Sequence, residues 1–190
     1  NHPYGWPMTF HRYSAVLLKK YSYLRKVQKN PGQTAAGGIT MALRQLRYEG
    51  DISLKKTCKE VLTVDDKIRE LLDDMMDTLR ATGNGAALAA NQVGILKRLV
   101  VVDYGDCQYK LVNPKIIGQS GVQECIEGCL SFPNRFGMTI RPQSVTIQAL
   151  NENGEEIILT GKWEMAKCFC HEIEHLDGEC FLDKVIKFID

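Results

Sequence analysis

The chain has 190 residues and a mass of 21.4 kDa, which suits one domain or one domain with an appendage. It is 44% hydrophobic and 25% charged, and no window approaches the roughly 18 apolar residues of a membrane span, so wholesale disorder and a helical membrane protein are excluded. The net charge of +1 hides an asymmetry, because residues 1–40 carry six basic and no acidic residues. The rest of the chain is net negative and lacks the basic footprint of a nucleic-acid-binding protein, so no DNA partner is expected.

Residues 1–40 form a distinct segment. They are rich in aromatic residues, basic and free of acidic residues, and they end in a Gly- and Ala-rich stretch over 31–38 that is typical of a linker. Even patterning begins at Met41, so we expect a basic N-terminal extension over 1–40 and one folded domain over 41–190. Three origins of the extension stay open: an organellar presequence, an expression-derived extension or an accessory arm.

A helix is the first element predicted in the main domain. Its N-cap is Thr63 or Asp65, apolar residues repeat at helical spacing up to Leu79, and Gly83 ends it. The stretch 83–92 that follows is rich in Gly and Ala and carries no charge. It lacks the Lys and Ser or Thr of a phosphate-binding loop, and its composition alone predicts a packing loop.

Short β-branched segments dominate the middle of the chain. Residues 99–102 predict a buried strand, and a hairpin turn is predicted at 151–154. Antiparallel strands are predicted near 110–117, 122–127, 138–150 and 155–161. A last helix is predicted from about Trp163 to Leu176, and it is apolar on most sides, as a buried helix is. These elements together indicate an α+β fold.

Seven cysteines are present, an odd number, and the sequence has no secretory signal pattern. Reduced thiols are therefore expected, and a metal-binding role for some of them is favoured over a disulfide framework.

The last helix carries the strongest chemical motif. His171 and His175 are four residues apart, so both imidazoles lie on one helical face and can reach a single metal ion. Glu172 lies beside that face, where a carboxylate can accept a proton from a metal-bound water. With four histidines in the chain, a chance match to this pattern is on the order of a per cent. We therefore favour a metal site over two structural core histidines.

A catalytic metal needs a third protein ligand and an open position. Phe181 stands where one class of zinc proteases has a third histidine, so the missing ligand should come from upstream. Cys129, in the segment 127–131 (EGCLS), is the strongest candidate. The competing thiols are those of Cys125, Cys168 and Cys170. A thiolate with two imidazoles suits ferrous, zinc, nickel or cobalt ions.

Three blocks occur in a defined order: the stretch 83–92, which ends in AANQ, then 127–131, then 171–178 (HEIEHLDG). This arrangement resembles that of the peptide deformylases, over about residues 41–190. The resemblance implies an α+β fold in which antiparallel β-sheets wrap around a buried metal-binding helix. It also implies a hydrolase that removes the N-formyl group from the formyl-methionine of nascent polypeptides and releases formate.

The resemblance further implies a role for each motif residue. Cys129, His171 and His175 would hold one divalent ion, expected to be Fe²⁺ and replaceable by Ni²⁺, Co²⁺ or Zn²⁺. Glu172 would act as the general base and then as the general acid.

The oxyanion of the reaction would be stabilised by Gln92 and by the backbone N–H of Leu130. The residues expected along the bound peptide are Gly85, Ala87, Glu127 and Gly128. The family usually has glycine where this chain has Ala87, and the extra methyl group is expected to narrow the groove there.

Two other functions remain open at this point. A metallopeptidase would use the same metal and Glu172, and a structural zinc module would combine His171 with several of the cysteines. We expect nascent formyl-methionyl peptides as partners, with a transient ribosome contact, no membrane and a monomeric state. The expected location is the bacterial cytoplasm, or an organelle if residues 1–40 are a presequence.

Overall fold

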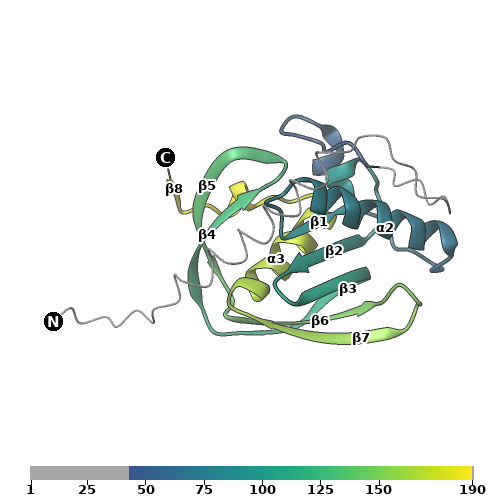
Figure 1. Cartoon of the computed structure of the whole chain (residues 1–190). Helices are drawn as coiled ribbons and strands as arrows, with labels where there is room; N and C mark the ends of the chain where they lie inside the picture. Colours follow the sequence, from purple (N-terminus) through teal and green to yellow (C-terminus); the bar gives the residue numbers. More distant parts are fainter. Residues whose placement is uncertain (1–42, 190) are drawn as a thin grey trace. The chain divides into compact units, whose positions relative to one another are not determined.

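Figure 1 shows a computed structural model of the chain, which describes residues 43–189. The predicted extension over 1–40 lies outside the described residues. The described part contains a five-stranded sheet, a three-stranded sheet and two α-helices, and both sheets are antiparallel. No helix in this part of the chain is long and apolar enough to cross a membrane. The predicted α+β fold is confirmed.

The larger sheet has the strand order β1-β2-β3-β6-β7. Its strands are β1 (Ala87–Ala89), β2 (Leu99–Tyr104), β3 (Cys107–Ser120), β6 (Ser144–Leu150) and β7 (Glu156–Lys162). The buried strand predicted at 99–102 is β2, in which all four of these residues are at most 1% exposed. Because β1 is the outermost strand on one side of this sheet, the backbone groups on its outer edge have no neighbouring strand of the sheet to pair with.

The smaller sheet has the strand order β4-β5-β8. Its strands are β4 (Gln123–Cys129), β5 (Phe132–Arg141) and β8 (Lys187–Ile189). The segment predicted near 138–150 is divided between the two sheets, because β5 ends at Arg141 and β6 begins at Ser144. Pro142 lies between them, and proline has no N–H to donate to a strand ladder. The short strand β8 was not predicted.

The helix α2 (Asp66–Ala81) packs on the larger sheet through its apolar stripe. Asp65 is the N-cap rather than Thr63, since its side chain accepts a hydrogen bond from the N–H of Ile68. The most buried members of the stripe are Leu72, Met75 and Leu79. They share a core with residues of β1 and β2, which fixes the segment after α2 against the sheet.

The helix α3 (Glu164–Leu176) contacts strands of the larger sheet and also β5 of the smaller one (Figure 1). Trp163, predicted as its first residue, is the N-cap with a φ of 54° and is 58% exposed. The remainder of the helix is buried on most sides, as predicted. His171, Glu172 and His175 are each at most 9% exposed, so the motif lies inside the protein.

Three short 3-10 helices complete the described part: η1 (Ile52–Lys55), η2 (Ala90–Val93) and η3 (Phe181–Lys184). The prediction of a loop over 83–92 was wrong for its second half, which contains β1 and most of η2. Ala87–Ala89 pair with Val100–Val102 of β2. This pairing fixes the backbone of Ala87–Ala89, and so the position of Gln92, which follows three residues later.

Candidate functional site

Three side chains that could hold a metal ion meet where β4 ends beside α3. The Sγ of Cys129 and one donor nitrogen of each of His171 and His175 all lie within 4.8 Å of one another. The Sγ of Cys129 is 3.1 Å from Nε2 of His175. Among the described residues, the cluster includes none of the competing thiols of Cys125, Cys168 and Cys170. The structure thus brings together the three residues that the sequence singled out as ligands.

His171 is oriented by a buried carboxylate. Its Nδ1 lies 2.7 Å from Oε2 of Glu127, a residue that is 2% exposed. Burial alone would raise the pKa of Glu127, but hydrogen bonds from His171 and Arg141 outweigh it and lower the pKa to about 2. An ionised carboxylate accepts the proton of Nδ1–H, which leaves Nε2 of His171 as the atom that can bind a metal.

Glu127 was expected along the bound peptide, and it borders the cavity, but its carboxylate is engaged by other side chains. The carboxylate accepts hydrogen bonds from Thr139 and Arg141 in addition to its contact with His171. Any contact of Glu127 with a peptide would therefore involve its backbone on β4, while its side chain orients His171.

Glu172 places a second buried carboxylate beside the cluster. The residue is 6% exposed, and its Oε2 has no hydrogen-bond partner among the described residues. Burial raises the pKa of Glu172 to about 7, although the charge of His171 opposes the rise. A carboxyl group with a pKa near neutrality can take up and release a proton at neutral pH.

Gln92 directs an amide N–H toward the thiol of the cluster. Its Oε1 accepts a hydrogen bond from the N–H of Ala89 at 2.9 Å, which fixes the orientation of the amide. Its Nε2 lies 3.3 Å from Sγ of Cys129 and 3.2 Å from Oγ of Ser131. Because Gln92 is only 1% exposed, it is a rigidly held donor.

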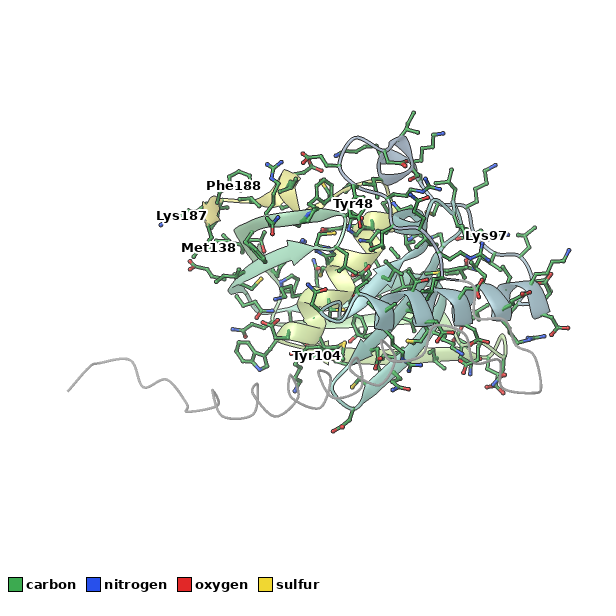
Figure 2. All side chains as sticks on the ribbon, turned by 45° about the horizontal axis from the view of Figure 1, so that its top comes forward. Tyr48, Lys97, Tyr104, Met138, Lys187 and Phe188 are labelled. Carbon is green, nitrogen blue, oxygen red and sulfur yellow. The ribbon has the colours of Figure 1, made fainter. Side chains whose placement is uncertain are left out.

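A cavity of about 610 Å³ opens over these side chains. Residues of β1 and of the end of β4 both border it, and each of these strands is the outermost one of its sheet. Tyr48 and Tyr104, labelled in Figure 2, border it from two further segments. Every predicted site residue except His175 borders the cavity, and His175 is fully buried. Two strand edges at one cavity suit an extended peptide.

Comparison with known proteins identifies the family. The model of the polypeptide deformylase family matches residues 43–188. The chain belongs to this family. It is 60% identical over 149 residues to peptide deformylase 2 of Clostridium acetobutylicum, a match that covers 78% of this chain and 99% of that protein. It is 52% identical to the peptide deformylase of Acetivibrio thermocellus, over 79% of this chain and 88% of that protein.

Solved peptide deformylase structures have the same fold. The enzyme from Legionella pneumophila superposes with a TM-score of 0.73 at 37% identity, over 76% of this chain and 86% of that one. The enzyme from Synechococcus elongatus, solved in complex with actinonin, gives a TM-score of 0.72 at 34% identity, over 81% of this chain and 87% of that one. Deformylases are metal-dependent hydrolases that remove the formyl group from the N-terminus of nascent polypeptides. Membership of this family decides against the metallopeptidase and the structural zinc module.

A methyl group at two glycines of this deformylase would make close contacts, with a buried side chain at Gly85 and with the exposed ring of Phe136 at Gly128. An ideal Cβ on Gly85 would lie 2.6 Å from Cδ1 of Leu79, and one on Gly128 would lie 2.7 Å from the ring of Phe136. Ala87, in contrast, lies within β1 and is 8% exposed, so the structure accommodates its methyl group. The departure from the usual family pattern at Ala87 therefore leaves β1 intact.

Sequence reasoning missed several residues of the deformylase site. Along α3 the cavity is bordered by Glu164, Lys167 and Cys168, which precede His171 by seven, four and three residues, and of these Cys168 had been considered only as a competing metal ligand. That spacing places all of them on the helical face of His171, so the helical period could have found them. Arg141 and Thr139, which bind Glu127, had a weaker signal, namely two polar residues at alternate positions in the otherwise apolar second half of β5.

Proposed function

We propose that Cys129, His171 and His175 hold the metal ion of this deformylase. The observation that carries the proposal is the meeting of three donor atoms within 4.8 Å beside the buried carboxylate of Glu172. The donor set fits a divalent transition metal, since two imidazoles and a thiolate suit iron, cobalt, nickel and zinc. The contact of His171 with Glu127 adds support, because metal-binding histidines commonly donate their other N–H to a carboxylate.

Fe²⁺ is the ion that we propose for the site, with Ni²⁺, Co²⁺ or Zn²⁺ able to replace it. A divalent ion there supplies Lewis-acid chemistry, which polarises a carbonyl oxygen and lowers the pKa of bound water. A thiolate ligand also makes the site sensitive to oxidation, so protein for assay is best prepared without oxygen.

The peptide lies extended between β1 and β4 in this proposal. Both strands are outermost in their sheets and border the cavity, so a peptide strand can add its hydrogen bonds to either edge. Gly85 and Ala87 lie along one side of the bound peptide, and the backbones of Glu127 and Gly128 lie along the other. The formyl group then reaches the three donor side chains, one at the end of β4 and two on α3.

Glu172 moves the proton of the reaction. Its Oε2 accepts a proton from the attacking water and later returns it to the leaving amine nitrogen, which releases formate and a free N-terminus. The pKa of about 7 that burial produces suits a group with both tasks.

The oxyanion that develops on the formyl oxygen, when water attacks the formyl carbon, is stabilised by Nε2 of Gln92 and by the backbone N–H of Leu130. Gln92 is held by its hydrogen bond to Ala89, and Leu130 follows Cys129 at the cavity wall. One such preorganised donor typically contributes about 3 kcal/mol to stabilisation of the transition state.

Nascent polypeptides are synthesised on ribosomes, and the relatives are bacterial proteins. We therefore place the reaction in the bacterial cytoplasm, on a monomeric enzyme that contacts the ribosome transiently. The organellar alternative depends on residues 1–40.

Formate release from a formyl-methionyl tripeptide tests the proposal. Glu172→Gln should lower turnover about 10²–10⁴-fold while the protein keeps one metal ion, because the carboxylate acts on protons and binds no metal. Glu179→Gln is the matched control, since Glu179 is an exposed carboxylate that pairs with Lys184, and it should leave turnover unchanged. Full turnover by Glu172→Gln would remove Glu172 from the mechanism, and loss of its metal would indicate a ligand role instead.

A further inference from the structure

Arg141 is a buried arginine at the end of β5, and its side chain is 3% exposed. Its Nε and Nη2 donate to the two oxygens of Glu127, at 2.5 and 3.2 Å. Its Nη1 and Nη2 donate to the two oxygens of Glu174, at 2.5 and 2.9 Å. One guanidinium group therefore holds two carboxylates, each through two hydrogen bonds, which is the strongest geometry for such pairs.

One of the two carboxylates contacts a ligand histidine directly, and the other belongs to the helix that carries both histidines. Glu127 contacts Nδ1 of His171, and Glu174 directly precedes His175 on α3. Arg141 itself belongs to β5, which pairs with β4, and β4 ends in Cys129. The guanidinium group thus joins the strand pair that carries the thiol to the helix that carries both imidazoles.

We propose that Arg141 is a positioning residue for the metal site. It holds Glu127 against His171 and fixes α3 to the β4–β5 pair, so that the three donor atoms keep the separations that bind a metal tightly. The inference rests on the ligand set of the proposed function.

A purely structural role would give a different result. A buried ion pair that loses one partner destabilises the protein, because the other charge stays buried without compensation. That loss lowers stability wherever the pair is located, whereas a positioning residue changes metal affinity in particular. Groups that orient metal ligands typically change metal affinity by about 10–100-fold when they are replaced. Metal affinity therefore separates the two roles.

The test measures the dissociation constant of Co²⁺ for metal-free protein, by competition with a chelator of known affinity. Arg141→Lys keeps the charge but not the planar fork that grips two carboxylates. We expect it to bind Co²⁺ about 10–100-fold more weakly than the unchanged protein and to shift the visible absorption bands of the bound ion. A dissociation constant within about threefold of the original, in a variant with unchanged circular dichroism, would overturn the inference.

Arg44→Lys is the matched control. Arg44 donates through Nε and Nη2 to Oδ2 of Asp74, at 3.0 and 2.6 Å, and Asp74 is 6% exposed. Neither residue contacts the donor cluster, so this variant should unfold at a lower temperature but keep its Co²⁺ affinity. Equal weakening by Arg44→Lys and Arg141→Lys would show a general loss of stability and refute a positioning role.

Two more variants keep the outcome decisive. If Arg141→Lys does not fold, Glu174→Gln removes one of its partners at a less buried place and should weaken Co²⁺ binding by more than about threefold. An unchanged affinity there would overturn the inference.

Cys129→Ala tests the ligand set alone: if it binds Co²⁺ as tightly as the unchanged protein, the proposed function fails. If Cys129→Ala loses binding while Arg141→Lys keeps it, only the inference about Arg141 fails.

Discussion

A methyl group added at Gly85 should disturb the site from the start of β1. An ideal Cβ there would lie 2.6 Å from Cδ1 of Leu79, and 2.9 Å from both Cδ1 of Leu130 and Oγ1 of Thr82. Leu79 belongs to α2, and its side chain is 1% exposed in the core, so it has no free space to move into. In the Gly85→Ala variant, the side chain of Leu79, the side chain of Leu130 or the backbone must therefore shift.

The expected cost follows from these distances. Overpacking a well-filled site typically costs about 1–3 kcal/mol, and three contacts under 3.0 Å suggest about 2 kcal/mol. In a domain of this size each kcal/mol lowers Tm by about 2–4 °C, so Gly85→Ala should lower Tm by about 4–8 °C. Since Leu130 supplies the proposed backbone donor, kcat should fall as well.

Thermal unfolding followed by circular dichroism, with kcat/KM measured on the same metal-loaded samples, tests this prediction. Ala87→Gly is the matched control, because it removes a methyl group from the same stretch and should cost only about 0.5–1 kcal/mol of strand stability. Leu79→Val removes the clashing Cδ1, so Gly85→Ala combined with Leu79→Val should be more stable than the sum of the single effects by about 1 kcal/mol. Strict additivity, or a Tm of Gly85→Ala within about 1 °C of the original, would refute the packing argument.

Other expected results concern Gln92, the metal and the N-terminal segment. Gln92→Leu should lower kcat by about 10²–10³-fold and keep the metal, and an unchanged kcat would exclude Gln92 as an oxyanion donor. Chelation should abolish turnover but preserve the circular dichroism spectrum, because apolar clusters hold the described domain together; unfolding on chelation would instead indicate a structural metal. Removal of residues 1–40 should leave Tm and kcat/KM unchanged, and a fall in either would show that the segment contributes to the domain.

Elements with local signals were predictable from the sequence. The helix α2 follows from its apolar period and from the Asp65 cap, and β2 follows from a run of β-branched residues. Where the signal is not local, prediction failed. Ala87–Ala89 have little strand preference of their own and form β1 because they pair with β2. The break between β5 and β6, in contrast, had a local signal in Pro142, which the prediction of one segment over 138–150 overlooked.

The residues of the candidate site likewise differ in whether the sequence alone could place them. The spacing of His171, Glu172 and His175 is a property of one helix, so the sequence by itself determined that two imidazoles share a face with a carboxylate beside them. Cys129 lies 46 residues before His175, and the sequence indicated its place only through the order of the blocks. The structure decided which thiol meets the histidines, because this depends on how β4 packs against α3.

Only the tertiary structure decided the environment of these groups. The low pKa of Glu127 comes from its hydrogen bonds with His171 and Arg141, against the effect of burial, and the raised pKa of Glu172 comes from burial; no spacing rule records either shift. Arg141 illustrates the reason, since its partners lie 14 and 33 residues away and are brought to it by the pairing of β4 with β5 and by the packing of α3. The sequence determined which chemical groups this deformylase carries on each element. Packing of those elements determined the distances, burial and charge around each group, because these depend on what lies opposite it in space.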